Sequence, residues 1–228
     1  MYYIVAICSV LCQVFISSIT VKFMQTSESN KNSLQVSKAF HKKLSLEDSG
    51  YEIIANTRQQ VLDTIINFNG HEHVVFFFAD KEFRNEVLEK FFKKAKSEKA
   101  PGLFYYDTLD TLPTSNQLKY DELIDSDNIV DLSKVINIVS EIHSKNLSGH
   151  TTRVSAEDCA WFLEKGFFEE HNEFERILGT FLSDNITCMC PYDATKVGEE
   201  YFGKIIRYYG YIIFDNPFCI FKLKNIQD

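Results

Sequence analysis

The chain has 228 residues, of which 45% are hydrophobic, and its 20 phenylalanines and 11 tyrosines exclude an intrinsically disordered protein. The formal net charge is −8, from 24 basic and 32 acidic residues. This balance argues against nucleic acid as a general partner, because duplex binding depends on Lys and Arg side chains at the phosphates. Six scattered cysteines are too few for a disulfide framework, so we expect reduced, mostly buried thiols in a cytoplasmic protein.

The N-terminal region allows three interpretations. Residues 1–21 carry no charge and are long enough to cross a bilayer, and Lys22 and the lysines after it would then keep the remaining chain in the cytoplasm. Alternatively, translation starts at Met24, or the segment is a buried element of the domain. We divide the chain into a hydrophobic segment (1–23), a polar linker (24–43) and one α/β domain (44–228).

From residue 51 onwards, helical and strand-like patterns follow one another. Apolar residues from Tyr51 to Ile66 recur at helical spacing behind Ser45 and Asp48, which predicts a first helix that ends near Asn69. Short apolar runs then alternate with amphipathic stretches. The expected strands are 74–79, 103–106, a short one at 128–130, 151–156, 186–190, 211–214 and 218–223; the expected helices are 81–98, 132–145, 158–182 with a break at Gly166, and 195–208.

This alternation predicts a mostly parallel sheet of five or more strands with helices on both faces. Parallel strands end at a common edge, which is where ligands bind in open parallel sheets. Carboxylates follow the expected strands at that edge; they are Asp80, Asp107, Glu157, Asp158, Asp193 and Asp215. Aspartates are also preferred helix caps, so Glu157, which Asp158 or Ser155 can replace as a cap, is the strongest candidate for ligand binding.

One segment matches a phosphate-binding motif without its chemistry. The sequence GEEYFGK at 198–204 has the Gly-x4-Gly-Lys spacing of a phosphate loop. However, Ile205 supplies no hydroxyl for magnesium, and Glu199 and Glu200 would repel phosphate. The apolar spacing continues through the segment as in a helix, so we expect no phosphate loop.

The His and Cys residues do not form a recognisable motif. His71 and His73 share a strand face but would need Cys188 or Cys190 to complete a zinc site, and the sequence places these at the opposite phase of the sheet. Cys190 and Cys159 are candidate nucleophiles, but no spacing ties either to a His and no nucleophile elbow is present. We therefore expect no metal, no cofactor and no catalysis.

Five blocks of sequence, within roughly residues 70–218, resemble the MEDS sensory domain of methanogens and methylotrophs. In chain order they are VVFFFADKEF after His73, TTRVSAEDCAWFL, EEHNEFERIL, ITCMCPYDATKV and YYGYIIFDNP. The resemblance implies a RecA/KaiC-like fold without a phosphate loop and a cytoplasmic sensor of small organic compounds. Such domains are often joined to DNA-binding or signalling modules. Here we expect a protein partner, self-association or the membrane segment to carry the output.

We therefore expect a non-catalytic sensory domain that binds a small organic ligand at the sheet edge. The expected site residues are Arg153 and Glu157 in the floor, Trp161 and Tyr192 in the walls, and His73, Asp80 and Asp193 at the rim. There are structural alternatives: Arg153 and Glu157 pair only with one another, and Trp161 is only part of the core. Two other functions stay open: a carboxylate- and magnesium-dependent enzyme that handles nucleotides, and an adaptor that only docks proteins.

Overall fold

A computed structural model describes residues 50–106, 116–125, 127, 129–146, 149–181 and 185–224. The hydrophobic segment and the linker expected at 1–23 and 24–43 lie outside these residues. Among the helices in the described ranges, none has the length and apolar character needed to cross a membrane.

The described residues form strands and helices in an alternating order. The strands are β1 (Tyr51–Ala55), β2 (Glu72–Phe78), β3 (Gly102–Tyr106), β4 (Asn116–Lys119), β5 (Thr152–Ala156), β6 (Ile186–Asp193), β7 (Tyr211–Asp215) and β8 (Phe218–Leu223). The α-helices are α3 (Arg58–Ile66), α4 (Lys81–Glu98), α5 (Leu132–Ser144), α6 (Ala160–Glu164), α7 (Phe168–Phe181) and α8 (Glu199–Ile205). Two short 3-10 helices are η1 (Tyr120–Leu123) and η2 (Ile206–Tyr208).

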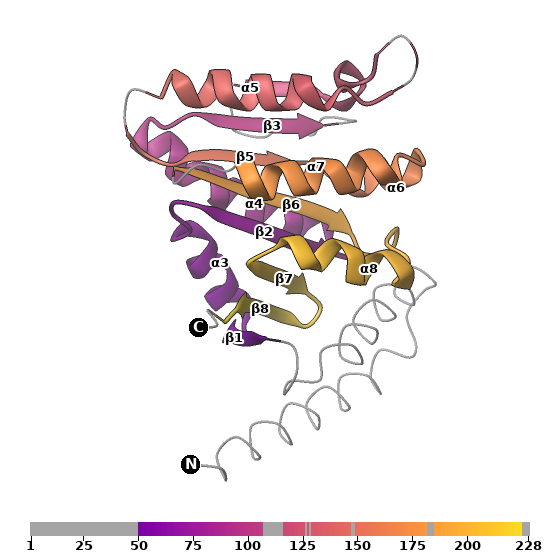
Figure 1. The fold of residues 1–228 in the computed structure, drawn as a ribbon. Helices are drawn as coiled ribbons and strands as arrows, with labels where there is room; N and C mark the ends of the chain where they lie inside the picture. The colour runs from indigo at the N-terminus through magenta and orange to yellow at the C-terminus, as the bar shows by residue number, and fades with distance from the viewer. Residues whose placement is uncertain are drawn as a thin grey trace.

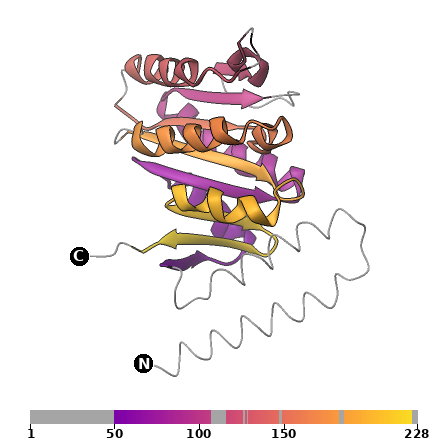
Figure 2. The same ribbon diagram turned by 45° about the vertical axis from the view of Figure 1, so that its right-hand side comes forward.

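All eight strands belong to one mixed sheet in the order β1-β8-β7-β2-β6-β5-β3-β4 (Figures 1 and 2). The strands from β7 to β4 are parallel, whereas β8 pairs antiparallel with both β7 and β1. The prediction of a mostly parallel sheet within an α/β fold is confirmed, and the antiparallel strands at one edge are an addition to it.

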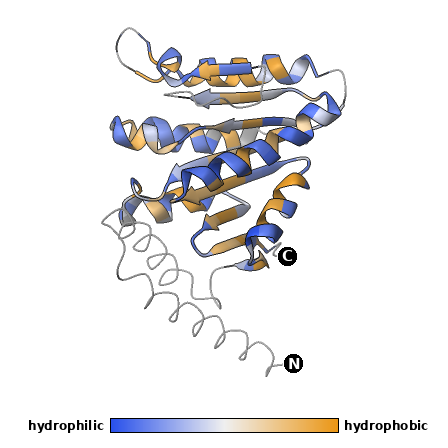
Figure 3. Ribbon diagram, turned by 180° about the vertical axis from the view of Figure 1, so that it is seen from behind, coloured by the Kyte–Doolittle hydropathy of each residue, from blue (hydrophilic) through white to orange (hydrophobic). Residues whose placement is uncertain are grey.

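Helices cover both faces of the sheet because its central strands are apolar on both sides. Along β2, Val75 and Phe77 pack under the helices α5 to α8, while Val74 and Phe76 pack against α3 and α4. Every residue of β6 is buried. Figure 3 shows α3 and α4 from behind, where their outer faces are largely hydrophilic. The strands are therefore buried by two helical layers, as continuous apolar runs require.

The prediction that the first helix begins at Tyr51 is wrong. Tyr51–Ala55 is the edge strand β1, and the helix α3 begins only at Arg58, where the Thr57 side chain accepts a hydrogen bond from the N–H of Gln60 (3.3 Å). Pairing with β8 supplies the backbone hydrogen bonds of this strand, and no local pattern records that pairing. The predicted cap at Ser45 and Asp48 lies outside the described residues.

The region 107–130 also differs from expectation. Asn116–Lys119 forms the edge strand β4, which the sequence did not indicate, because its residues are polar or half-buried. Of the expected strand at 128–130, the described residues 129 and 130 contribute one isolated antiparallel bridge, between Ile124 and Val130. The other strands and helices lie close to where they are expected, and Gly166 separates α6 from α7 with a φ of 80°. The helix expected at 195–208 is shorter: Gly198 precedes α8, which holds the rest of the GEEYFGK segment and passes into η2.

The central strands β2 and β6 create a crevice at the carboxyl edge of the sheet. They are neighbours, yet the helices that follow them leave on opposite faces. The helix α4 after β2 packs with the cluster on one face, and α8 after β6 packs on the other. In open α/β sheets this arrangement separates the two connections and leaves room for a ligand.

Asp215, at the end of β7, links β7 to the residues that follow β2 at this edge. It is 8% exposed, and its Oδ2 accepts hydrogen bonds from the N–H groups of Ala79 and Asp80, at 2.7 Å each. Burial raises the pKa of Asp215 to about 6. The native state therefore holds the proton more tightly than the unfolded state.

A raised native pKa predicts that the contribution of Asp215 to stability falls as the pH rises from about 4 to about 6. The variant Asp215→Asn keeps an acceptor oxygen and removes the charge. It should increase the free energy of unfolding by about 2 kcal/mol near pH 7 and change it little near pH 4. Urea unfolding at both pH values measures this, with the exposed Asp63→Asn as control. An equal effect at both pH values would contradict the prediction.

Candidate functional site

A cleft of about 140 Å³ opens at the carboxyl edge of the sheet, at the crevice between β2 and β6. The end of β2, the first turns of α4, the segment after β5 and the segment after β6 all contribute to it. Its lining residues are Phe78, Lys81, Arg84, Tyr120, Glu157, Asp158, Trp161, Glu164 and Lys196. The cleft therefore lies where the strand order places a ligand site.

Arg84 is a buried cation in the wall of this cleft. Its side chain is 5% exposed, and the guanidinium carbon lies 5.3 Å from the centre of the Phe78 ring. Nε and Nη2 donate to Oδ1 of Asn85, at 3.1 and 2.8 Å, and Nη1 donates to the carbonyl oxygen of Glu157 at 3.4 Å. Among the described residues, these partners include no carboxylate. The Arg84 charge is therefore hydrogen-bonded but not neutralised.

The opposite wall is held by Lys196, which bridges two carboxylates. Its Nζ lies 2.9 Å from Oδ2 of Asp158 and 2.8 Å from Oε2 of Glu164. Burial alone would lower the pKa of Lys196. Its bonds to the two carboxylates have the larger, opposite effect, so the pKa is raised above its usual value. Oδ1 of Asp158 also accepts from the N–H groups of Asp193 (2.9 Å) and Ala160 (3.0 Å). Asp158 thus joins the segments that follow β5 and β6.

Trp161 forms an aromatic wall of the cleft. It is 4% exposed and stacks on Tyr120, with ring centres 4.8 Å apart and planes at 10°. Its Nε1 has no hydrogen-bond acceptor in the described part of the chain. Buried indole N–H groups usually have a partner, and the described residues do not supply one for this donor.

Arg153 and Glu157 do not form the predicted pocket floor. Arg153 lies near the amino end of β5, where its Nη2 donates to the carbonyl oxygen of Phe68 (2.5 Å) and its guanidinium lies 4.8 Å from the centre of the Phe91 ring. Burial lowers the pKa of Arg153 to about 10. Glu157 follows the other end of β5, where its N–H donates to Tyr105. The two residues are four positions apart along an extended chain, which separates their backbones by about 13 Å.

Asp80 and Asp193 lie at the expected edge, but their oxygens serve the backbone. Oδ1 of Asp80 accepts from the N–H groups of Glu82 (2.8 Å) and Phe83 (3.3 Å) at the start of α4. Oδ1 of Asp193 accepts from the N–H (2.9 Å) and hydroxyl (2.6 Å) of Thr195. Neither lines the cleft, so the capping interpretation accounts for both.

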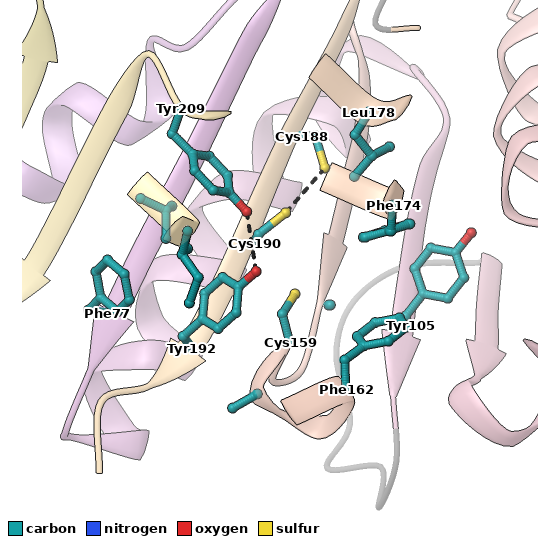
Figure 4. Close-up of a cluster of buried hydrophobic side chains, with 14 of the residues drawn as sticks. Phe77, Tyr105, Cys159, Phe162, Phe174, Leu178, Cys188, Cys190, Tyr192 and Tyr209 are labelled. Atoms are coloured by element: carbon teal, nitrogen blue, oxygen red, sulfur yellow. Dashed lines mark hydrogen bonds between the residues drawn. The ribbon is translucent and has the colours of Figure 1, made fainter. Parts of the chain in front are cut away.

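His73 and Tyr192 lie away from the cleft, in a buried polar cluster beneath α7. The Tyr192 hydroxyl donates to Oε1 of Glu175 (2.7 Å) and lies 2.6 Å from Nε2 of His171 and 3.4 Å from the Tyr209 hydroxyl. Nε2 of His73 lies 3.2 Å from Oε2 of Glu175. Figure 4 shows the Tyr192 and Tyr209 hydroxyls meeting beside Cys190. These two predicted residues therefore belong to a different part of the molecule.

The expectation that His73 and the two cysteines lie at opposite phases of the sheet is wrong. The parallel register pairs His73 with Cys188 and Val75 with Cys190, so all of them face the same helices. Nε2 of His73 lies 3.8 Å from Sγ of Cys190. His71 precedes the strand and is exposed. Only the register between β2 and β6, which no single strand encodes, brings these side chains together.

Sequence reasoning missed the cations of the cleft, among them Arg84 and Lys196. Arg84 does carry a signal, because it lies at helical spacing from Leu88, Phe91 and Ala95, on the buried face of α4. A charged residue on an apolar helix face indicates a specific partner. Lys196 carries no such signal, since its position depends on Asp158, 38 residues earlier.

Comparisons with known proteins add little. No family model and no curated protein matches the chain. Among solved structures, it is similar to a protein from Pyrococcus horikoshii OT3, described as a structural study of project PH0250, with 10% identity, a TM-score of 0.43, and coverage of 74% of this chain and 93% of that one. We transfer no property from that protein.

The bridge between Lys196 and Asp158 yields a stability prediction. Lys196→Met should lower the free energy of unfolding by about 1–3 kcal/mol, because it leaves the mostly buried Asp158 carboxylate, 14% exposed, without its cation. Glu164→Gln breaks only the more exposed half of the bridge and should cost less than about 1 kcal/mol. Denaturant unfolding near neutral pH compares the two variants. Equal losses would show that Asp158 does not depend on Lys196.

Proposed function

We propose that this chain is a domain that binds a small ligand with an anionic group, such as a phosphate or carboxylate, in the cleft between β2 and β6. The observation that carries the proposal is Arg84. Its buried guanidinium faces the cleft and, within the described residues, has no carboxylate partner. Arginine is well suited to such an anion because its planar fork can donate two parallel hydrogen bonds.

The charges of the cleft give a ligand one preferred orientation. Arg84 and Lys81 lie on the α4 wall, whereas Asp158 and Glu164 on the opposite wall are occupied by Lys196. The anionic group would therefore sit against α4. Because Asp80 already occupies the first N–H groups of that helix, the side chains rather than the helix terminus would recognise the anion.

The remaining part of the ligand would lie against Trp161. The indole supplies an aromatic surface and an N–H donor, and Glu157 adds a carboxylate close by. The cleft volume of about 140 Å³ is below the ~300–1,000 Å³ of pockets for drug-sized molecules. A compact ligand with an anionic end and an acceptor or apolar end fits these features best.

A sensory role follows from the same proposal. The resemblance to the MEDS family, with its RecA/KaiC-like fold, favours binding without turnover and an output through a protein partner or a second copy. A ligand held between Arg84 and Trp161 would join α4 to α6, which lie on opposite faces of the sheet. Occupancy could then shift the relative positions of these helices, as a sensor requires.

The variant Arg84→Met tests the proposal. Inorganic phosphate, acetate and adenosine monophosphate serve as probes on the full chain, with calorimetry and thermal unfolding as measurements. We expect at least one probe to stabilise the protein and Arg84→Met to weaken its binding by about tenfold or more, the worth of a charge-assisted hydrogen bond.

Arg153→Met is the matched control, because Arg153 is also buried and also lies over a Phe ring, but at the amino edge of the sheet. It should leave the affinity within about twofold. Similar losses in both variants, or no response to any anion in a folded wild-type protein, would refute the assignment. Turnover of a nucleotide with magnesium would instead favour the enzyme alternative.

A further inference from the structure

The polar cluster beneath α7 contains the donor atoms of a metal site. Cys188 and Cys190 project from β6, His73 from the adjacent β2, and Glu175 from α7. All are buried, with Glu175 fully enclosed. The ligand atoms of His73, Cys188 and Cys190 all lie within 4.8 Å of one another. Figure 4 shows the two sulfur atoms directed at each other from the same strand.

The distances match the edges of a tetrahedron around a zinc-like ion. Metal–sulfur bonds near 2.3 Å and metal–nitrogen bonds near 2.0 Å separate two sulfurs by about 3.8 Å and a sulfur from a nitrogen by about 3.5 Å. The two sulfurs of Cys188 and Cys190 are 3.8 Å apart, and Sγ of Cys190 is 3.8 Å from Nε2 of His73. The ligands need little movement to close on one ion.

The imidazole of His73 is oriented as a metal ligand should be. Its Nδ1 lies 3.0 Å from the carbonyl oxygen of Tyr208, which can only accept, so Nδ1 carries a proton. Nε2, on the other side of the ring, faces the two sulfurs and Glu175. Metal-binding histidines usually donate their second N–H to a carbonyl or carboxylate in this way.

Glu175 provides an independent indication of a bound cation. One oxygen, Oε1, accepts the hydrogen bond from Tyr192, whereas Oε2 accepts no well-aligned hydrogen bond from the described residues and has the His73 imidazole as its ion-pair neighbour. Oε2 lies 3.2 Å from Nε2 of His73, close to the roughly 3.4 Å edge that a shared metal would impose. A fully buried carboxylate oxygen without a well-aligned donor is rare, and a cation coordinated jointly by Oε2 and Nε2 of His73 would satisfy it.

We propose that Cys188, Cys190, His73 and Glu175 form a closed site for one divalent zinc-class ion. Binding forms two metal–sulfur bonds, and each thiol releases its proton to solvent. Nε2 of His73 and Oε2 of Glu175 each donate a lone pair to the metal, and a proton shared by these two atoms is also released to solvent. No oxidant or reductant takes part. Thiolate and imidazole donors select zinc over magnesium or calcium, and four protein ligands indicate a structural rather than a hydrolytic ion. This site is separate from the cleft and goes beyond the proposed function.

A second cleft, between α7 and α8, lies next to the cluster. It has a volume of about 170 Å³ and is lined by His171 together with residues of both helices. Nε2 of His171 lies 2.6 Å from the Tyr192 hydroxyl, which in turn donates to Glu175. Separation of α7 from α8 would therefore open a polar path to the metal ligands.

Titration of the full chain with cobalt, after treatment with chelator and reductant, tests the site. We expect one Co²⁺ per chain, a thiolate-to-cobalt charge-transfer band in the near ultraviolet, tetrahedral visible bands, and displacement by zinc. Cys190→Ser should weaken cobalt binding by more than about 100-fold, since loss of a ligand exceeds the 10–100-fold effect of outer partners. Glu175→Gln should weaken it by about tenfold or more while the sulfur band remains.

Cys219→Ser is the control, because Cys219 is a buried cysteine of the same sheet outside the cluster. It should keep both the cobalt stoichiometry and the band. Circular dichroism verifies that each variant is folded. Absence of the sulfur band in the folded wild-type chain, or equal weakening by Cys219→Ser and Cys190→Ser, would overturn the proposal. If Cys190→Ser does not fold, alkylation of the wild-type thiols is compared with and without one equivalent of zinc. We expect zinc to protect the thiols, and thiols that remain unprotected would overturn the proposal.

Discussion

The parallel pairing of β2 with β6, in one fixed register, positions both candidate sites of this protein. At the amino half of the pair it places His73 beside Cys188, on the face covered by α7. At the carboxyl end Phe78 pairs with Asp193. From there β2 leads to α4 on one face of the sheet, and β6 leads to α8 on the other face. A shift of one residue would turn His73 to the opposite face. Both candidate sites therefore depend on the same row of backbone hydrogen bonds.

The core is mostly apolar, so burial of each polar group costs free energy unless a partner or a ligand satisfies it. Arg84 and Arg153 are both buried and both lie over Phe rings, but they differ in location. Arg153 lies at the amino edge, where it bonds the carbonyl oxygen of Phe68. Arg84 lies at the edge where helices on opposite faces diverge, beside a cleft. The surroundings, and not the residue type, decide which of the two can meet a ligand.

Much of the fold could be predicted from local patterns. The helix α4 occupies the expected 81–98, and the break at Gly166 occurs where the pattern stops. The edge strands β1 and β4 could not be predicted, because half-exposed strands have weak patterns and their backbone bonds come from distant partners. Of the candidate cleft, the sequence indicated Glu157 and Trp161 but not Arg84 or Lys196.

Local sequence patterns are sufficient to predict an α/β sheet with continuous apolar strands and a row of carboxylates at its carboxyl edge. Both features are local, because they depend only on how residues are spaced along each strand and where each strand ends. Only the packed fold shows that Arg153 and Glu157 lie at opposite ends of β5, and that His73 lies with Cys188, Cys190 and Glu175. Strand order and register set these distances, and both arise from packing between segments far apart in the chain.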